Sequence, residues 1–173
     1  AEQERILRVG IDVQANEKIT TKGDDRAHLV FLDGTSISVG PNSSLVLDKF
    51  VYDPNSKKGE LALTAARGVF RLVGGNISKG NEITITTPSA SIGIRGGIMS
   101  FDVGANGSTN ANFYYGESMK VSAQGVTEVA TREGSTITVE MGRHPSQPTI
   151  IPPHGLHLSG AFEKSGGVSV GTS

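Results

Sequence analysis

Hydrophobic and polar residues alternate with a period of two along most of this chain. Leu45 and Leu47 lie on one predicted strand face, and Ile83 and Ile85 alternate with threonines. Such segments recur every 8–12 residues as far as Val139, and none shows the 3.6-residue period of a helix. The pattern predicts an all-β domain of about a dozen short strands. The strands could close as a barrel, pack as a sandwich or wind as a solenoid, and we expect a solenoid- or sandwich-like module.

Turn signals separate the predicted strands. Asp33 and Gly34 stand between the β-prone runs 27–32 and 35–39. An Asp-Gly pair in that position predicts a hairpin with a type I′ turn, which needs positive φ at both central residues. Further turns are predicted at residues 40–42, 53–56 and 104–112.

The composition changes near Gly142. Residues 143–173 hold four of the seven prolines, five glycines and five serines. This predicts a β domain over residues 1–142 and an extended tail over residues 143–173. Val168 and Val170 share one face of a short strand in the tail, which could add to the sheet edge of another copy.

Composition narrows the class of protein. With 16 Lys+Arg against 17 Asp+Glu, the chain lacks the basic footprint of a nucleic-acid binder. It has no Cys, which excludes disulfides and thiolate metal sites. No apolar stretch approaches the ~20 residues of a membrane span. The chain starts at Ala1 without Met, as after signal-peptide removal, so we expect an exported protein in the periplasm or at the cell surface.

Three groups of residues resemble chemical motifs without completing them. His154 and His157 have the spacing of a metal pair on a helix, but their Pro/Gly-rich segment is not helical, so no metal is predicted. His28 is expected to pair with Asp24 or Asp25. These two aspartates are not part of a calcium-loop pattern, so no calcium site is predicted there.

The glycine-rich segment 74–80 lacks the Gly-Lys-Ser/Thr ending of a phosphate loop and is predicted to be a hairpin loop. With no nucleophile–base set and no cofactor motif, the sequence predicts a protein that is not an enzyme and holds no cofactor.

The most distinctive string spans residues 93–97. Its glycines, among them Gly93 and Gly96, indicate close backbone approach or positive φ. Arg95 between them could grip an anionic ligand. The structural alternative, which we favour, is that Arg95 pairs with an aspartate such as Asp48 or Asp102.

An ordered series of blocks resembles the FecR domain family. The blocks lie at residues 17–23, 27–35, 40–44, 50–53, 68–71 and 86–96, within residues 10–103. The last block usually ends Arg-Gly-Thr, whereas here it is Arg95-Gly96-Gly97. The resemblance implies a bacterial extracytoplasmic β module. The best-known members are transmembrane sigma regulators whose periplasmic domain touches an outer-membrane transporter, and this chain resembles a free-standing exported form.

Two functions remain open. The first is a structural protein that self-assembles through its sheet edges and tail into an oligomer or filament, since its sparse charge offers little repulsion. The alternative is a periplasmic sensor or adaptor whose loops, such as 53–59 and 104–112, bind a cell-envelope protein or glycan.

Overall fold

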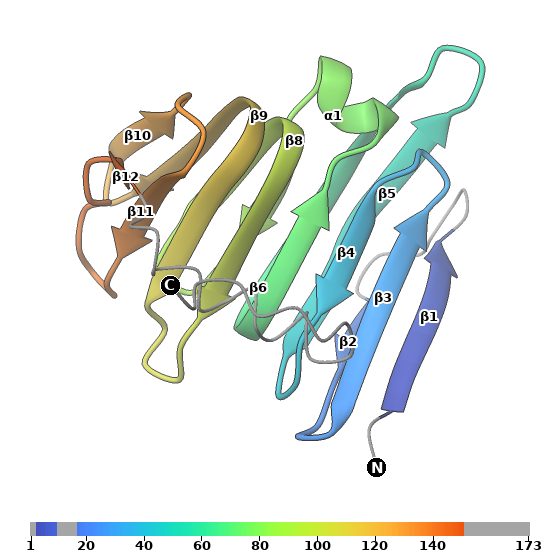
Figure 1. The fold of residues 1–173 in the computed structure, drawn as a ribbon, viewed down its shortest axis with the longest axis horizontal. Helices are drawn as coiled ribbons and strands as arrows, with labels where there is room; N and C mark the ends of the chain where they lie inside the picture. Colours follow the sequence, from blue (N-terminus) through green and yellow to red (C-terminus); the bar gives the residue numbers. More distant parts are fainter. Residues whose placement is uncertain (1–2, 10–16, 151–173) are drawn as a thin grey trace, which may run out of the picture.

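The computed structural model describes residues 3–9 and 17–150, and it shows one twelve-stranded sheet with one short helix (Figure 1). The all-β prediction is therefore confirmed. The elements are β1 (Gln3–Val9), β2 (Glu17–Thr20), β3 (Asp25–Phe31), β4 (Ser36–Val39), β5 (Ser44–Asp53), β6 (Lys58–Val73), α1 (Asn76–Gly80), β7 (Ile83–Thr86), β8 (Ser91–Val103), β9 (Thr109–Ala123), β10 (Val126–Ala130), β11 (Ser135–Val139) and β12 (Thr149–Ile150).

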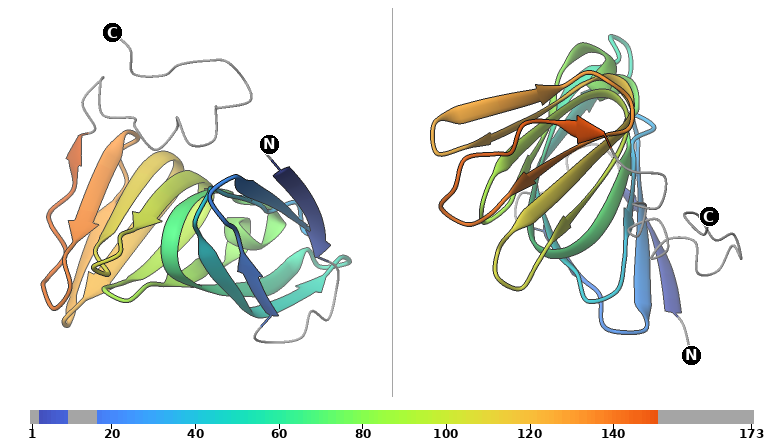
Figure 2. Two further views of the ribbon diagram at one scale, coloured as in Figure 1. Left: turned by 90° about the horizontal axis from the view of Figure 1, so that it is seen from below. Right: turned by 60° about the vertical axis from the view of Figure 1, so that its left-hand side comes forward.

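The single sheet curls back over itself into two layers because its three longest strands serve both (Figure 2). The first layer runs β1-β3-β4-β6-β8-β9-β11-β12, and the second runs β2-β5-β6-β7-β8-β9-β10. Residues 58–67 of β6 pair with β5 in the second layer, whereas residues 68–73 pair with β8 in the first. Strands β8 and β9 divide in the same way.

Glycines with positive φ stand at the bends of these long strands. Gly68 in β6, Gly97 in β8 and Gly116 in β9 have φ of +121°, +127° and +135°. Gly97 pairs directly with Gly116, and a Cβ atom on Gly97 would lie 1.8 Å from the carbonyl oxygen of Tyr115. Gly96, with φ of +58°, also adopts the positive φ that its string predicts.

The structure has about as many strands as predicted, but they do not match the predicted segments one to one, because three strands are longer than the sequence pattern predicts. Strands β6, β8 and β9 have 16, 13 and 15 residues, and each joins two segments that the pattern separates. The glycines within them suggested strand ends, whereas the backbone bends there and continues. Likewise, the turn predicted at 104–112 ends at residue 108, because β9 begins at Thr109.

The hydrophobic core fills the space between the two layers. Phe31 of β3 and Phe50 of β5 meet edge to face with ring centroids 5.2 Å apart, although their strands are not hydrogen-bonded neighbours. Phe70 and Phe101 stack at 4.8 Å on neighbouring strands of the first layer. All four rings are buried, and each contributes roughly 1.5–3 kcal/mol to stability. The sequence left a solenoid-like and a sandwich-like module open, and the two layers that enclose this core correspond to the sandwich-like one.

The Asp33-Gly34 turn is present, but it is not of type I′. Only Gly34 has positive φ, at +94°. The Gly34 N–H donates to the Phe31 carbonyl at 2.9 Å and the Phe31 N–H donates to the Thr35 carbonyl at 2.8 Å, which defines a three-residue loop. The type I′ prediction is wrong because the loop has three residues and Asp33 lacks the positive φ that a type I′ turn needs. The side chain of Asp33 is buried and hydrogen-bonded.

Segment 74–80, predicted to be a hairpin loop, contains the helix α1 instead. The Asp33 carboxylate holds this helix across 44 residues of sequence: it accepts from the N–H of Ile77 at 3.0 Å and from the Thr35 hydroxyl at 2.8 Å. The Asp33 carbonyl accepts from the N–H of Asn76 at 2.9 Å. The short helix therefore depends on a distant turn for its position.

Part of the predicted tail lies within the described residues. Strand β12 pairs antiparallel with β11, with Ser135 opposite Ile150, so this part of the chain adds to the domain's own sheet. Val168, Val170, His154 and His157 lie outside the described residues. Within residues 3–9 and 17–150, no helix has the length and apolar character that a membrane span requires.

Candidate interaction groove

A groove of about 840 Å³ lies over the bends of β8 and β9. Its lining residues include residues of α1 and of the loop that joins β10 to β11, and both elements lie at the upper end of the sheet in Figure 1. Lys79 of α1 stands on one side, and Arg132 and Glu133 of the loop stand on the other. We call it the interaction groove.

Backbone forms much of the floor of the interaction groove. Gly74, Gly96, Gly97 and Gly116 line it, and none has a side chain that would cover the main chain. The Gly74 N–H donates to the Gly97 carbonyl at 2.7 Å, which ties the segment leading into α1 to the bend of β8. This hydrogen bond joins two segments that both line the groove.

An exposed aromatic residue stands in the interaction groove. A β-bulge interrupts the pairing of β8 with β9 between Ile98 and Met99, and it leaves Tyr115 opposite Ile98 while Phe113 points into the core. Bulges often re-aim side chains in this way. Tyr115 is 61% exposed, although it lies in the middle of the long strand β9. Together with Ile98 it offers an amphipathic contact surface.

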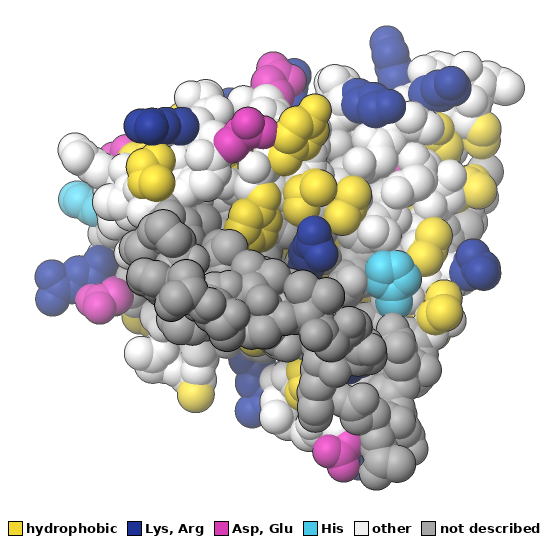
Figure 3. Space-filling model, viewed as in Figure 1, with side chains coloured by type: hydrophobic (Ala, Val, Ile, Leu, Met, Phe, Trp, Pro, Cys, Tyr) yellow, Lys and Arg dark blue, Asp and Glu magenta, His cyan; other side chains and the backbone are white. Residues whose placement is uncertain are grey.

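Charges of both signs surround this aromatic residue. Lys79 and Arg132 supply two cations, and Glu117 and Glu133 supply two carboxylates. The two ion pairs found within the described chain lie elsewhere, on the second layer. Figure 3 shows hydrophobic side chains gathered over β8 and β9 with acidic and basic side chains along the upper rim.

The residues that line the interaction groove include few groups that could act in catalysis. On the α1 side, the lining includes one residue with a hydroxyl group, Ser78. Its Oγ donates a hydrogen bond to the carbonyl of Gly75 at 3.2 Å. No histidine lines the groove, so no Ser–His pair is assembled there. Nowhere in residues 3–9 and 17–150 do three or more His, Asp or Glu side chains gather to hold a metal ion.

Arg95 does not form the predicted ion pair. It lies half-buried opposite Ser118 on the outer face of the second layer. Asp48 instead accepts the hydroxyl of Thr64 at 2.6 Å, and Asp102 lies beyond the bend of β8, in the first layer. The bend separates Arg95 from Asp102, which residue spacing alone could not reveal.

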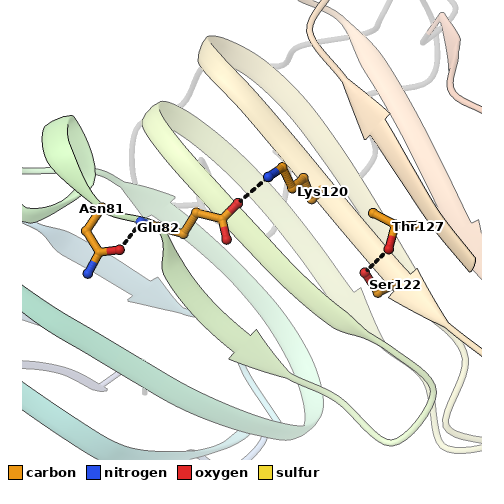
Figure 4. A network of polar contacts seen from close by, with 5 residues as sticks. All are labelled: Asn81, Glu82, Lys120, Ser122 and Thr127. Atoms are coloured by element: carbon orange, nitrogen blue, oxygen red, sulfur yellow. Dashed lines mark hydrogen bonds and ion pairs between the residues drawn. The ribbon is translucent and has the colours of Figure 1, made fainter. Parts of the chain in front are cut away.

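Gly93 has a local role in the same string. Glu82 precedes β7, and its side chain reaches across β8 toward Lys120 of β9, with Glu82 Oε2 3.4 Å from Lys120 Nζ (Figure 4). A Cβ atom on Gly93 would lie 3.0 Å from the Glu82 carboxylate. Because Gly93 has no side chain, the Glu82 carboxylate can cross β8 and reach Lys120 on β9.

His28 and Asp25 are also placed differently from the prediction. The Nδ1 atom of His28 lies 3.1 Å from the hydroxyl of Ser38 on the neighbouring strand β4. Asp25 accepts the N–H of Lys22 at 3.2 Å, as a turn residue would. The predicted His–Asp pairing is absent because His28 points across the sheet, toward β4.

The fold defines a two-layered β module with a groove over the bends of its long strands. The family model named FecR protein matches residues 17–134, more than half of the chain. The chain belongs to the FecR family. No curated protein matches it.

Two crystal structures of candidate anti-sigma factors from Parabacteroides distasonis ATCC 8503, at 2.50 and 1.65 Å resolution, share the fold. Each superposes with a TM-score of 0.56 and covers 76% of this chain, at 11% and 10% identity. The chain spans 59% of the length of these solved chains. At such identities the likeness concerns the fold.

Proposed function

We propose that this chain is a sensor or adaptor module of the bacterial cell envelope that binds a segment of a partner protein in the interaction groove. The module acts in the periplasm, and it regulates by binding and not by catalysis. Membership of the FecR family and the likeness to anti-sigma factors support a regulatory role. The proposal rests above all on Tyr115, an aromatic residue exposed beside Ile98.

The groove has the features of a protein-binding hot spot. Exposed tyrosine and arginine residues contribute most strongly where neighbouring groups exclude water. Here Tyr115 lies beside the lining glycines, and the charges of both signs around it can pair with opposite charges on the partner. A rigid backbone floor lowers the entropy that binding costs.

Self-assembly has less support. Its proposed tail strand, Val168 and Val170, lies outside the described residues, and neither the family match nor the fold likeness favours a filament. Light scattering in the experiment below distinguishes a polymer of this chain from a 1:1 complex with a partner.

The test uses the purified full chain and a partner isolated with it from the cell envelope and then purified. We expect a 1:1 complex by light scattering, and Tyr115→Ser should weaken Kd by about tenfold or more in calorimetry. Val129→Ser, an exposed apolar residue on β10 outside the groove, is the matched control and should leave Kd unchanged. Equal affinity for the wild type and Tyr115→Ser, or a chain that exists only as polymers, would contradict the proposal.

A further inference from the structure

A second hollow lies at the other end of β8 and β9, beside the loop that joins them. It has a volume of about 740 Å³, which is in the range of pockets for small ligands or a few peptide residues. Three cationic side chains line it: Lys18, Lys22 and Arg67. Pro88 and Met141 supply an apolar wall. We call this hollow the basic cleft.

The sheet register builds the basic cleft. Thr20 of β2 pairs with Ser44 of β5, and Ser44 pairs with Arg67 of β6, so these three residues form one row across three strands. Lys18 lies two residues before Thr20, and both are exposed because Ile19 between them enters the core. Arg67 directly precedes the Gly68 bend, which leaves it exposed at the corner of the sheet.

The cations of the basic cleft are not neutralised by neighbouring carboxylates. No Asp or Glu lines the cleft, and none of its three cations forms an ion pair within the described residues. Asp25 lies close, but its carboxylate accepts the backbone N–H of Lys22. The chain as a whole has a formal net charge of -1, so the lining of the basic cleft is more positive than the average of the chain.

Asp102 is the carboxylate that shares a hollow with Arg67. The two line an adjoining hollow of about 310 Å³. Burial raises the pKa of Asp102 above its ordinary value, while a hydrogen bond from Asn110 opposes this shift. No ion pair among the described residues joins Asp102 to Arg67.

We propose that the basic cleft binds an acidic, partly apolar peptide segment of a partner protein. The guanidinium of Arg67 offers a fork for one carboxylate, and Lys18 and Lys22 attract a second. The apolar wall at Met141, which is 52% exposed, takes an aliphatic side chain next to the carboxylates. The basic cleft and the interaction groove share no lining residue. A test of peptide binding in the cleft is therefore independent of a test of the function proposed above.

The probe is the peptide acetyl-Leu-Glu-Leu-Glu-amide, titrated into the ¹⁵N-labelled full chain. We expect amide shifts at residues 18–22, 43–44 and 104–107, and affinity that falls as salt is raised. Arg67→Ala should weaken binding by about fivefold or more, and Lys22→Ala by a smaller factor. Lys58→Ala, an exposed cation outside the cleft, is the matched control and should bind like the wild type.

Three comparisons decide the outcome. The neutral peptide acetyl-Leu-Gln-Leu-Gln-amide should bind at least about tenfold more weakly than the acidic one. Equal binding of both peptides, or of the wild type and a folded Arg67→Ala variant, would overturn the proposal. Tighter binding of inorganic phosphate or of an alginate oligosaccharide than of the acidic peptide would also overturn it, in favour of a phosphate or glycan site. Fold integrity is read from the unshifted amides of the same spectra.

Discussion

At the scale of single residues, the paired glycines of β8 and β9 make the fold possible. A Cβ atom on Gly97 would lie 1.8 Å from the Tyr115 carbonyl oxygen, and one on Gly116 would lie 1.6 Å from that of Gly96. In both cases the obstacle is backbone, which cannot rotate aside like a side chain. The positive φ at both positions adds strain for any L-residue.

Gly97→Ala is therefore expected to destabilise the protein by about 3 kcal/mol or more, because a steric clash is added to an unfavourable φ. The measurement is the free energy of unfolding in urea. Gly80→Ala is the matched control, since a Cβ atom there meets nothing within 4 Å, and it should change stability by less than about 0.5 kcal/mol. Similar stabilities of the two variants would show that the bend tolerates a side chain.

At the scale of elements, α1 shows how a distant residue decides a local structure. A helix of five residues is unstable alone, and its N-cap residue, Gly75, has no side chain that could form a capping hydrogen bond. Asp33 and Thr35 take over this role: Thr35 Oγ1 accepts the Gly75 N–H at 3.0 Å, and Asp33 accepts that of Ile77. Because α1 forms one wall of the interaction groove, this turn also shapes the binding surface.

Asp33→Asn should loosen α1 without unfolding the sheet. The new amide NH₂ would face the N–H and O–H donors that the carboxylate now accepts, and losing these contacts costs about 2 kcal/mol. We expect faster hydrogen exchange at residues 75–81 and weaker partner binding in the groove. Asp53→Asn, in an exposed turn with one hydrogen bond to the Asn55 N–H, is the control. Unchanged exchange at 75–81 would contradict the role assigned to Asp33.

At the scale of the whole molecule, the two layers are not independent. Strands β6, β8 and β9 each contribute one half to the first layer and the other half to the second. The core lies between the layers, as the contact of Phe31 with Phe50 illustrates. Neither layer can lose its core face without exposing that of the other.

We consequently expect residues 17–139 to unfold as one cooperative unit. Calorimetry of the full chain should give one transition for the sheet, with equal calorimetric and van't Hoff enthalpies. The destabilised variant Gly97→Ala should keep this single transition at a lower midpoint. Two resolved transitions, in which β2 and β5 melt apart from β3 and β4, would contradict a shared core.

The sequence by itself determined the class of fold, its strand faces and most of its turns. Alternation is a local property, so core residues such as Ile83 and Ile85 could be assigned from neighbours alone. Only the tertiary structure decided that the glycines near residue 97 bend a strand without ending it. The positions of Arg95, Tyr115 and Arg67 also depended on it, because cross-strand register and bulges join residues that the chain keeps far apart.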